Sequence, residues 1–298
     1  MFPPLVTIFN TNHCQHSCRH CFLSITRTLN TGEMDYQDFR RLIESLRGHG
    51  IFLISLTGGD PFLHPRAYDM IQAIGKADFK PLVACNLSPV IDFDRLLAMN
   101  VTSLQFSMDA SNASGHDFVR GRGCFDSTCD FIIRAKRHGL KVNLSVCVTV
   151  KNRGDVATLV KLARHLGIYR LKFVFWDGFF GAPGATGFSL TKEMRAEVRA
   201  TLVRLDRTEG IADWVVLSGF DLRRAQPLTA RWLDLSIAAN GDVFVGPRGL
   251  RLCNCFSDSD WMTQYARAST RNRMKLTRES EQRNLEGMDD DIAGSESD

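Results

Sequence analysis

The segment Cys14-Gln-His-Ser-Cys18-Arg-His-Cys21 places three cysteines at C-x3-C-x2-C spacing, close to the N-terminus. Three thiolates this close together can bind three irons of a cubane cluster, which leaves the fourth iron without a protein ligand. An iron that is open to a small molecule is a catalytic arrangement. Structural zinc is the alternative that the triplet leaves open, with His13, His16 or His20 as its fourth ligand.

Around this segment the chain alternates apolar, strand-like runs with stretches at helical spacing. Strands are expected at residues 5–9, 51–56, 81–85, 101–108, 140–150 and 169–176, and helices at residues 36–48, 66–76, 93–99, 125–138 and 155–166. Six such units imply right-handed crossovers and a parallel sheet. We therefore predict an α/β fold of the partial (β/α)6 barrel type. A doubly wound open sheet is the alternative, because periodicity does not give strand order.

The C-terminal part of the chain has a different pattern. A glycine-rich loop at residues 179–187 precedes an expected helix at 190–207 and a strand at 213–217, and Asn240-Gly241 is a signal for a type I′ hairpin. We predict three parts: a barrel over residues 1–188, a small α+β annex over 189–262, and a polar, partly disordered tail over 263–298.

Composition limits the possible settings of the protein. The chain has 298 residues, 44% of them hydrophobic, and its net charge of +4 is too mild to indicate a nucleic-acid role. Its first residues lack the basic and apolar regions of a signal peptide, and no apolar run is long enough to cross a bilayer. Nine cysteines, an odd number with three clustered, indicate reduced thiols and metal in the cytoplasm.

Four unusual segments directly follow predicted strands. They are the cysteine segment, Gly58-Gly59-Asp60-Pro61, Asn86, and Ser107-Met108-Asp109. In an open parallel barrel, functional residues gather at the carboxyl ends of the strands, so these segments should meet. Adjacent glycines permit a close approach to the backbone, although a plain tight turn explains them as well. Turn roles stay open for Asn86 and Ser107, and a helix-cap role for Asp109.

Together these segments resemble the radical S-adenosylmethionine (AdoMet) superfamily, abbreviated radical SAM. The cysteines match its C-x3-C-x2-C signature, and Gly58-Gly59-Asp60-Pro61 is similar to its Gly-Gly-Glu-Pro motif, with Asp in place of Glu. Residues 104–109 and 116–121 resemble the branch of peptide-modifying enzymes with SPASM or twitch extensions. The resemblance covers residues 5–176.

The resemblance implies a role for each matched residue. Cys14, Cys18 and Cys21 would ligate a [4Fe–4S] cluster whose open iron is chelated by AdoMet. The implied AdoMet contacts are Gly58, Gly59 and Asp60 to the amino group, Ser107 and Asn86 to the ribose, Arg120 to the carboxylate, and His20 and Phe22 to the adenine. Reductive cleavage of AdoMet would give a 5′-deoxyadenosyl radical that abstracts a substrate hydrogen. A flavodoxin or ferredoxin is implied as the reductant.

The annex resembles a degenerate SPASM or twitch domain. Residues 237–243 look like its opening hairpin, but Val245-Gly246-Pro247 stands where a cysteine is usual, and only Cys253 and Cys255 remain. Two cysteines cannot ligate a cluster fully. An annex that only closes the barrel is therefore favoured over one with an auxiliary cluster.

We expect a radical SAM enzyme that modifies a peptide, by a cross-link, an epimerisation or an oxidation in a ribosomally made natural product. A dehydrogenase, decarboxylase or epimerase acting on a small sugar, nucleoside or amino acid is the alternative within the superfamily. A metal-binding regulatory protein without catalysis is the alternative outside it. The expected catalytic or substrate-contacting residues are Trp176 and Asp177, followed by Phe179, Phe180, Arg248 and Arg251.

Overall fold

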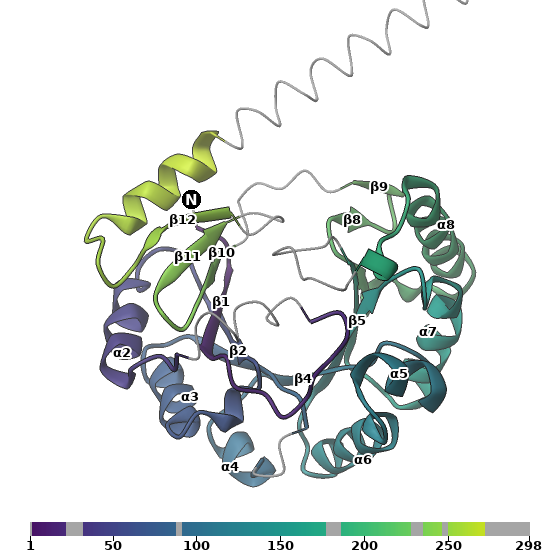
Figure 1. Ribbon diagram of the computed structural model, residues 1–298, viewed down its shortest axis with the longest axis horizontal. Helices are drawn as coiled ribbons and strands as arrows, with labels where there is room; N and C mark the ends of the chain where they lie inside the picture. Colours follow the sequence, from purple (N-terminus) through teal and green to yellow (C-terminus); the bar gives the residue numbers. More distant parts are fainter. Residues whose placement is uncertain are drawn as a thin grey trace, which may run out of the picture.

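The computed structural model describes residues 2–21, 32–87, 91–176, 186–227, 235–245 and 250–271. Figure 1 shows a curved sheet with helices around its outer face. The parallel strands of the barrel are β1 (Leu5–Thr11), β2 (Leu53–Gly58), β3 (Lys80–Ala84), β4 (Ser103–Ser107), β5 (Val142–Val148), β6 (Arg170–Phe175) and β7 (Val215–Leu217). The first six strands overlap the six that the sequence predicts.

The helices that cover the sheet also follow the sequence pattern, with one addition. They are α2 (Tyr36–Ser45), α3 (Ala67–Lys76), α4 (Phe93–Ala98), α5 (Ala113–Arg120), α6 (Cys124–Arg137), α7 (Val156–His165) and α8 (Lys192–Glu209). Helix α5 was not expected, since it follows β4 as a short extra helix before α6. It begins at the N-cap Asn112, whose side chain accepts a hydrogen bond from the Gly115 amide at 2.9 Å.

Strand order decides between the two predicted architectures. Strands β1 to β7 lie side by side in chain order and each neighbouring pair is parallel. A doubly wound sheet would reverse direction at a switch point, and no such point occurs in the described sheet. Its two edges, β12 and β9, remain unpaired with each other, as a partial barrel requires. The partial-barrel prediction is therefore confirmed.

The C-terminal strands extend the sheet at its β1 edge. Strand β10 (Leu235–Ile237) pairs in parallel with β1, and β11 (Asp242–Val245) and β12 (Leu250–Asn254) follow in antiparallel order. The predicted type I′ turn is wrong, because only Gly241, and not Asn240, has a positive φ. The Gly241 amide instead donates to the Ala238 carbonyl at 2.9 Å, as in a type I turn followed by a glycine bulge. At the other edge lie β8 (Phe220–Asp221) and β9 (Gln226–Pro227).

Alternation along the strands separates the packed face from the barrel interior. In β6, Leu171, Phe173 and Phe175 are buried in the core that also contains the apolar faces of α7 and α8. The intervening Lys172 and Val174 are more exposed and point to the opposite face, the interior. The interior is therefore accessible at this level.

Residues 261–271 are helical and lie near the N-terminus of the chain. Tyr265 is fully buried there and stacks on Phe2 with ring centroids 4.8 Å apart. The division into barrel, annex and tail remains a prediction, and residues 272–298 lie outside the described part. Within the described residues, no helix is both long and apolar enough to cross a bilayer.

Candidate functional site

The cysteine segment follows β1 and packs directly on the end of β2. The Gly59 amide donates to the Thr11 carbonyl at 2.8 Å, and the Asp60 amide donates to the His13 carbonyl at 2.7 Å. A Cβ atom at Gly58 would lie 2.3 Å from the Thr11 oxygen, and one at Gly59 would lie 2.1 Å from the His13 oxygen. The two glycines are therefore needed because the backbone of the cysteine segment approaches them.

Asp60 ends this contact and is completely buried. Its Oδ2 atom accepts hydrogen bonds from Gln15 Nε2 at 2.8 Å and from the main-chain amide of Asn86 at 3.2 Å, while Oδ1 accepts from the main-chain amide of Phe62 at 3.2 Å. Burial raises the pKa of Asp60, and these donors oppose the shift. The carboxylate thus joins the ends of β2 and β3 to the cysteine segment.

Asn86, just after β3, reaches the same segment from its other side. Its Nδ2 atom donates to the Gly59 carbonyl at 2.6 Å and lies 3.7 Å from the Cys14 sulfur. Its main-chain oxygen is 3.1 Å from Nε2 of His16, whose Nδ1 lies 3.5 Å from the Cys124 sulfur. Asn86 is therefore more than a turn residue, because it connects two strand ends with a predicted cluster ligand.

Asp109 forms the centre of a second, fully buried polar group at the end of β4. Its Oδ2 atom is 2.6 Å from Nε of Arg120 and 3.3 Å from Nε2 of His20, and its Oδ1 accepts from the Cys147 amide at 3.0 Å. Burial alone would raise the pKa of Asp109, but the Arg120 charge, together with the contacts to His20 and the Cys147 main-chain amide, outweighs it and holds the pKa well below its usual range. Asp109 does not cap α5, since Asn112 does.

Arg120, the last residue of α5, is aimed by this pairing at the cysteine segment. Its Nη1 atom lies 3.5 Å from Oδ1 of Asn86 and 3.9 Å from the Cys18 sulfur. Only 14% of the side chain is exposed, so Arg120 is not an ordinary surface arginine. Burial raises the pKa of the Cys18 thiol to about 11, although Arg120 opposes the shift.

The remaining predicted residues fall into two groups. His20 is buried with its ring 6.2 Å from that of Phe188, and its carbonyl accepts a hydrogen bond from Trp176 Nε1 at 3.3 Å. Ser107 is half-buried at the end of β4, opposite Ser145 of β5. Five predicted contacts lie outside the described residues: Phe22, Asp177, Phe179, Phe180 and Arg248.

The structure also brings in residues to which the sequence analysis gave no role in this site. Gln15 and His16 occupy unspecified positions inside the cysteine motif, and His116 and Cys124 lie on α5 and at the start of α6. His116 Nδ1 accepts from the Asp109 amide at 3.0 Å, and burial lowers the pKa of His116 to about 4. Position in the sequence could have pointed to Gln15 and His16, because both lie between predicted cluster ligands.

The cysteines of the annex have a different setting. Cys253 is buried and Cys255 partly buried, and burial raises their thiol pKa values to about 11 and about 12. Between them, Asn254 donates from Nδ2 to the Asn240 carbonyl at 2.8 Å. Arg251, expected to meet substrate, instead pairs with Asp242 at 2.8 Å. These polar groups close the hairpin on itself.

The strand-end site fits an iron–sulfur cube in its donor chemistry. The three thiols are partly exposed on one short segment. Cys21 and Cys14 lie close enough to Cys18 to contribute to the raised pKa of its thiol. Each thiolate of a cube binds a different iron, so the sulfur atoms need not converge on a single point. Among the described residues, no three His, Cys, Asp or Glu side chains converge closely enough to hold one metal ion.

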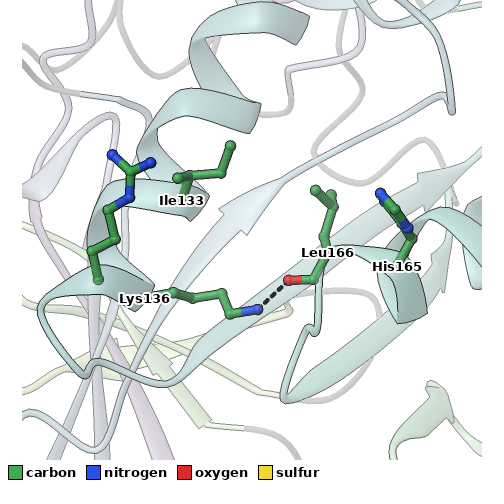
Figure 2. A pocket seen from close by; sticks show the side chains of 5 residues that line it. Ile133, Lys136, His165 and Leu166 are labelled. Carbon is green, nitrogen blue, oxygen red and sulfur yellow. Dashed lines mark hydrogen bonds between the residues drawn. The ribbon is translucent and has the colours of Figure 1, made fainter.

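A surface hollow of about 450 Å³ lies elsewhere, between the C-terminal ends of α6 and α7 (Figure 2). It is lined by Ile133, Lys136, Arg137, His165 and Leu166, and the Lys136 ammonium donates to the Leu166 carbonyl. In a β/α barrel the helix C-termini lie at the amino ends of the strands, away from the end that carries function. This hollow therefore does not belong to the candidate site.

Comparisons with known proteins identify the family. A family model described as the radical SAM superfamily matches residues 9–163, more than half of the chain. The antilisterial bacteriocin subtilosin biosynthesis protein AlbA of Bacillus subtilis (strain 168) is 25% identical over 268 residues, which are 87% of this chain and 59% of AlbA. An AdoMet-dependent heme synthase of Methanosarcina barkeri (strain Fusaro / DSM 804) is 26% identical over 189 residues, 62% of this chain and 52% of that protein.

Solved structures show the same fold. Streptococcus suis SuiB bound to its precursor peptide SuiA has a TM-score of 0.69 and 16% identity, covering 89% of this chain and 65% of SuiB. SuiB has also been solved bound to S-adenosylmethionine. This chain spans between half and three-fifths of the length of the two curated relatives.

Proposed function

This chain belongs to the radical SAM superfamily, an enzyme superfamily that uses a [4Fe–4S] cluster and AdoMet, and we propose that it modifies a peptide by hydrogen abstraction. The observation that carries the proposal is the meeting of four strand ends on the cysteine segment. Arg120 Nη1 lies 3.9 Å from the Cys18 sulfur, and Asn86 Nδ2 lies 3.7 Å from the Cys14 sulfur.

In this proposal, Cys14, Cys18 and Cys21 hold the cluster. When bound, the cluster would supply the electron for reductive cleavage of AdoMet, the chemistry that leads to hydrogen abstraction from substrate. The protein contributes position: Gly58 and Gly59 fix the cysteine segment on β2 through the contacts to Thr11 and His13.

Arg120 is the residue proposed to bind the carboxylate of AdoMet. The guanidinium is planar and presents several donors in a fixed fork, which suits a carboxylate. Asp109 pairs with Nε at 2.6 Å and leaves Nη1 directed toward Cys18 and Asn86. Ser107, half-buried one strand from Ser145, is the proposed ribose contact.

His20 and Phe22 are the proposed adenine contacts. His20 lies in the same buried group as Asp109 and borders Phe188. Trp176 packs against the cysteine segment through its hydrogen bond to the His20 carbonyl. Trp176 and Asp177 remain the proposed boundary between the AdoMet site and substrate.

Two observations favour a polar substrate such as a peptide. The interior positions level with Ser107 are Ser145 and Lys172, which pair in register across β4, β5 and β6. Lys172 is exposed in the interior, so an anionic or carbonyl group of a substrate can reach it. The AlbA alignment also extends over 87% of this chain, whereas that of the heme synthase covers 62%. A small metabolite is the second candidate. A flavodoxin or ferredoxin in the cytoplasm is the proposed reductant.

The test uses anaerobically reconstituted protein, AdoMet, a chemical reductant and peptides encoded beside its gene. The expected result is 5′-deoxyadenosine whose formation is stimulated by one peptide, together with a mass change in that peptide. A cluster and AdoMet cleavage without any peptide change, but with turnover of a small metabolite, would favour the second candidate. Absence of cluster and of AdoMet binding would contradict the proposal as a whole.

A further inference from the structure

Gln15 lies between the first two cysteines, and its side-chain oxygen Oε1 is an acceptor at the candidate site. Its side chain is exposed, yet its Nε2 atom donates to Asp60 Oδ2 at 2.8 Å and also to the main-chain oxygen of Asn86. A primary amide has two N–H donors, so both are used by these two acceptors. The carbonyl oxygen Oε1 takes part in neither bond, because it can only accept.

Asp60 itself cannot reach a ligand in this arrangement. The residue is completely buried, and its two oxygens already accept from Gln15, from the Asn86 amide and from the Phe62 amide. The superfamily motif has Glu where this chain has Asp60, and one methylene adds about 1.5 Å of reach. The Gln15 amide lies directly beyond the shorter carboxylate, where a longer one would extend.

The neighbouring acceptors are also engaged. The Gly59 carbonyl accepts from Asn86 Nδ2 at 2.6 Å, and the Asn86 carbonyl accepts from Gln15 and lies 3.1 Å from His16 Nε2. Gln15 directly follows Cys14, one of the proposed cluster ligands. Its Oε1 atom is thus an acceptor without a described donor, beside the place where AdoMet would chelate the open iron.

We infer that Gln15 Oε1 receives the amino group of AdoMet and that Asp60 is a positioning residue that holds the amide in place. An ammonium group is a donor and needs oxygen acceptors. The buried Asp60 carboxylate accepts a hydrogen bond from the Gln15 amide nitrogen, and this bond orients the amide oxygen toward the ligand. This inference rests on the proposed function, because it takes the three cysteines as the cluster site.

The experiment measures AdoMet dissociation constants by equilibrium dialysis on anaerobically reconstituted protein, with iron content as a parallel readout. The variants are Gln15→Ala, Asp60→Glu, and the two combined, with Gln72→Ala of α3 as a matched control at an exposed glutamine. Each variant is also tested with an AdoMet analogue that lacks the amino group. Loss of one charge-assisted hydrogen bond weakens binding by about tenfold to a hundredfold.

Gln15→Ala is expected to retain the iron content of the wild type and to bind AdoMet about tenfold to a hundredfold more weakly. Its affinity for the analogue should be unchanged. Asp60→Glu in the Gln15→Ala background should recover most of the lost affinity, because the longer carboxylate reaches the vacated position. Gln72→Ala should have no effect.

Two results separate the inference from the proposed function. Wild-type protein that holds iron but does not bind AdoMet would contradict the proposed function. Wild-type protein that binds AdoMet, with Gln15→Ala binding it equally well, would overturn the inference alone. Equal losses for AdoMet and the analogue, without recovery by Asp60→Glu, would reduce Gln15 to a structural role and overturn it too.

Discussion

The cysteine segment and the annex hairpin both carry closely spaced cysteines on the same sheet, but their surroundings differ. Around Cys14 and Cys18, side chains from other elements approach the sulfur atoms: Asn86, just after β3, at 3.7 Å and Arg120, at the end of α5, at 3.9 Å. Around Cys253 and Cys255, the described polar contacts come from the hairpin and the turn after it, as in the bonds of Asn254 to Asn240 and Asp258. Cysteine spacing alone therefore does not define a cluster site, because the groups that other elements bring to it also count.

The strongest test of this comparison removes the thiols in each region separately. Replacing Cys14, Cys18 and Cys21 together by Ala should abolish iron binding, whereas Cys253→Ala with Cys255→Ala should retain about four irons per chain, the content of one cube. Iron and sulfide are measured after anaerobic reconstitution. Iron that survives in the triple variant would place a second cluster in the annex and remove the contrast.

A matched pair of glycines should separate the regions next. In Gly59→Ala the new Cβ would meet the backbone oxygen of His13 at 2.1 Å, and backbone cannot yield without moving the cysteine segment. In Gly241→Ala the Cβ would meet the Phe256 ring at 2.3 Å at a φ of +85°, which strains only the hairpin. We expect Gly59→Ala to lose most of its iron and Gly241→Ala to keep it.

Equal iron contents in the two glycine variants would contradict the role given to Gly59. Circular dichroism on both variants serves as the control that each has folded.

Each region also contains a carboxylate–arginine pair, and the two pairs should differ in how much stability is lost when they are broken. Asp109→Asn leaves the buried Arg120 without its partner, and breaking such a buried pair costs about 3–5 kcal/mol. Asp242→Asn breaks the exposed pair with Arg251, which is worth at most about 1 kcal/mol. Urea unfolding of the iron-free protein under reducing conditions measures both. Similar losses in the two variants would show that Asp109 is not the centre of a desolvated group.

The pH dependence of that buried group provides a smaller effect. Burial lowers the pKa of His116 to about 4, while the unfolded value is 6.5, so the unfolded chain binds more protons between these values. The contribution of neutral His116 to the free energy of unfolding is therefore fully present above pH 6.5. It is lost as the pH falls toward 4, by up to about 3 kcal/mol. His116→Gln should flatten this part of the stability profile, measured by urea unfolding from pH 4.5 to 7.5. An unchanged slope would contradict the buried neutral state of His116.

The smallest expected effect concerns Trp176. Trp176→Phe keeps an aromatic ring but removes the indole N–H and its hydrogen bond to the His20 carbonyl, a bond worth about 1 kcal/mol of stability. If Trp176 mainly supports the cysteine segment, the variant should hold the same iron and cleave AdoMet at a rate within a few-fold of the wild type. Complete loss of AdoMet cleavage with iron retained would give Trp176 a direct part in the chemistry.

Much of the fold could be predicted from the sequence, because its strands are strongly patterned. The six strand–helix units and their open barrel follow from apolar runs such as residues 51–56 and 140–150. Helix α5 was missed because residues 113–120 carry few apolar side chains. The turn at Asn240-Gly241 was assigned the wrong type, since only Gly241 adopts a positive φ. Propensity identified the turn, but the pairing of the strands decided its geometry.

The site was partly predictable for the same reason. Motif residues were found by their place after strands, which the fold brings together. The roles of Gln15, His16 and Asp109 were not predictable, because they depend on which side chains fill the space between strand ends. The buried Asp60, one methylene shorter than the motif residue, shows this clearly: its partner Gln15 becomes visible only when β2 and β3 are side by side.

The most direct test of the central claim is electron paramagnetic resonance of the reduced, reconstituted protein, recorded with and without AdoMet. The strand-end site predicts the signal of one [4Fe–4S] cluster that changes when AdoMet is added, because AdoMet binds the iron that lacks a cysteine. The signal should be absent in the Cys14, Cys18 and Cys21 variant and present when Cys253 and Cys255 are replaced. A signal unaffected by AdoMet, or tightly bound zinc in place of iron, would contradict the account.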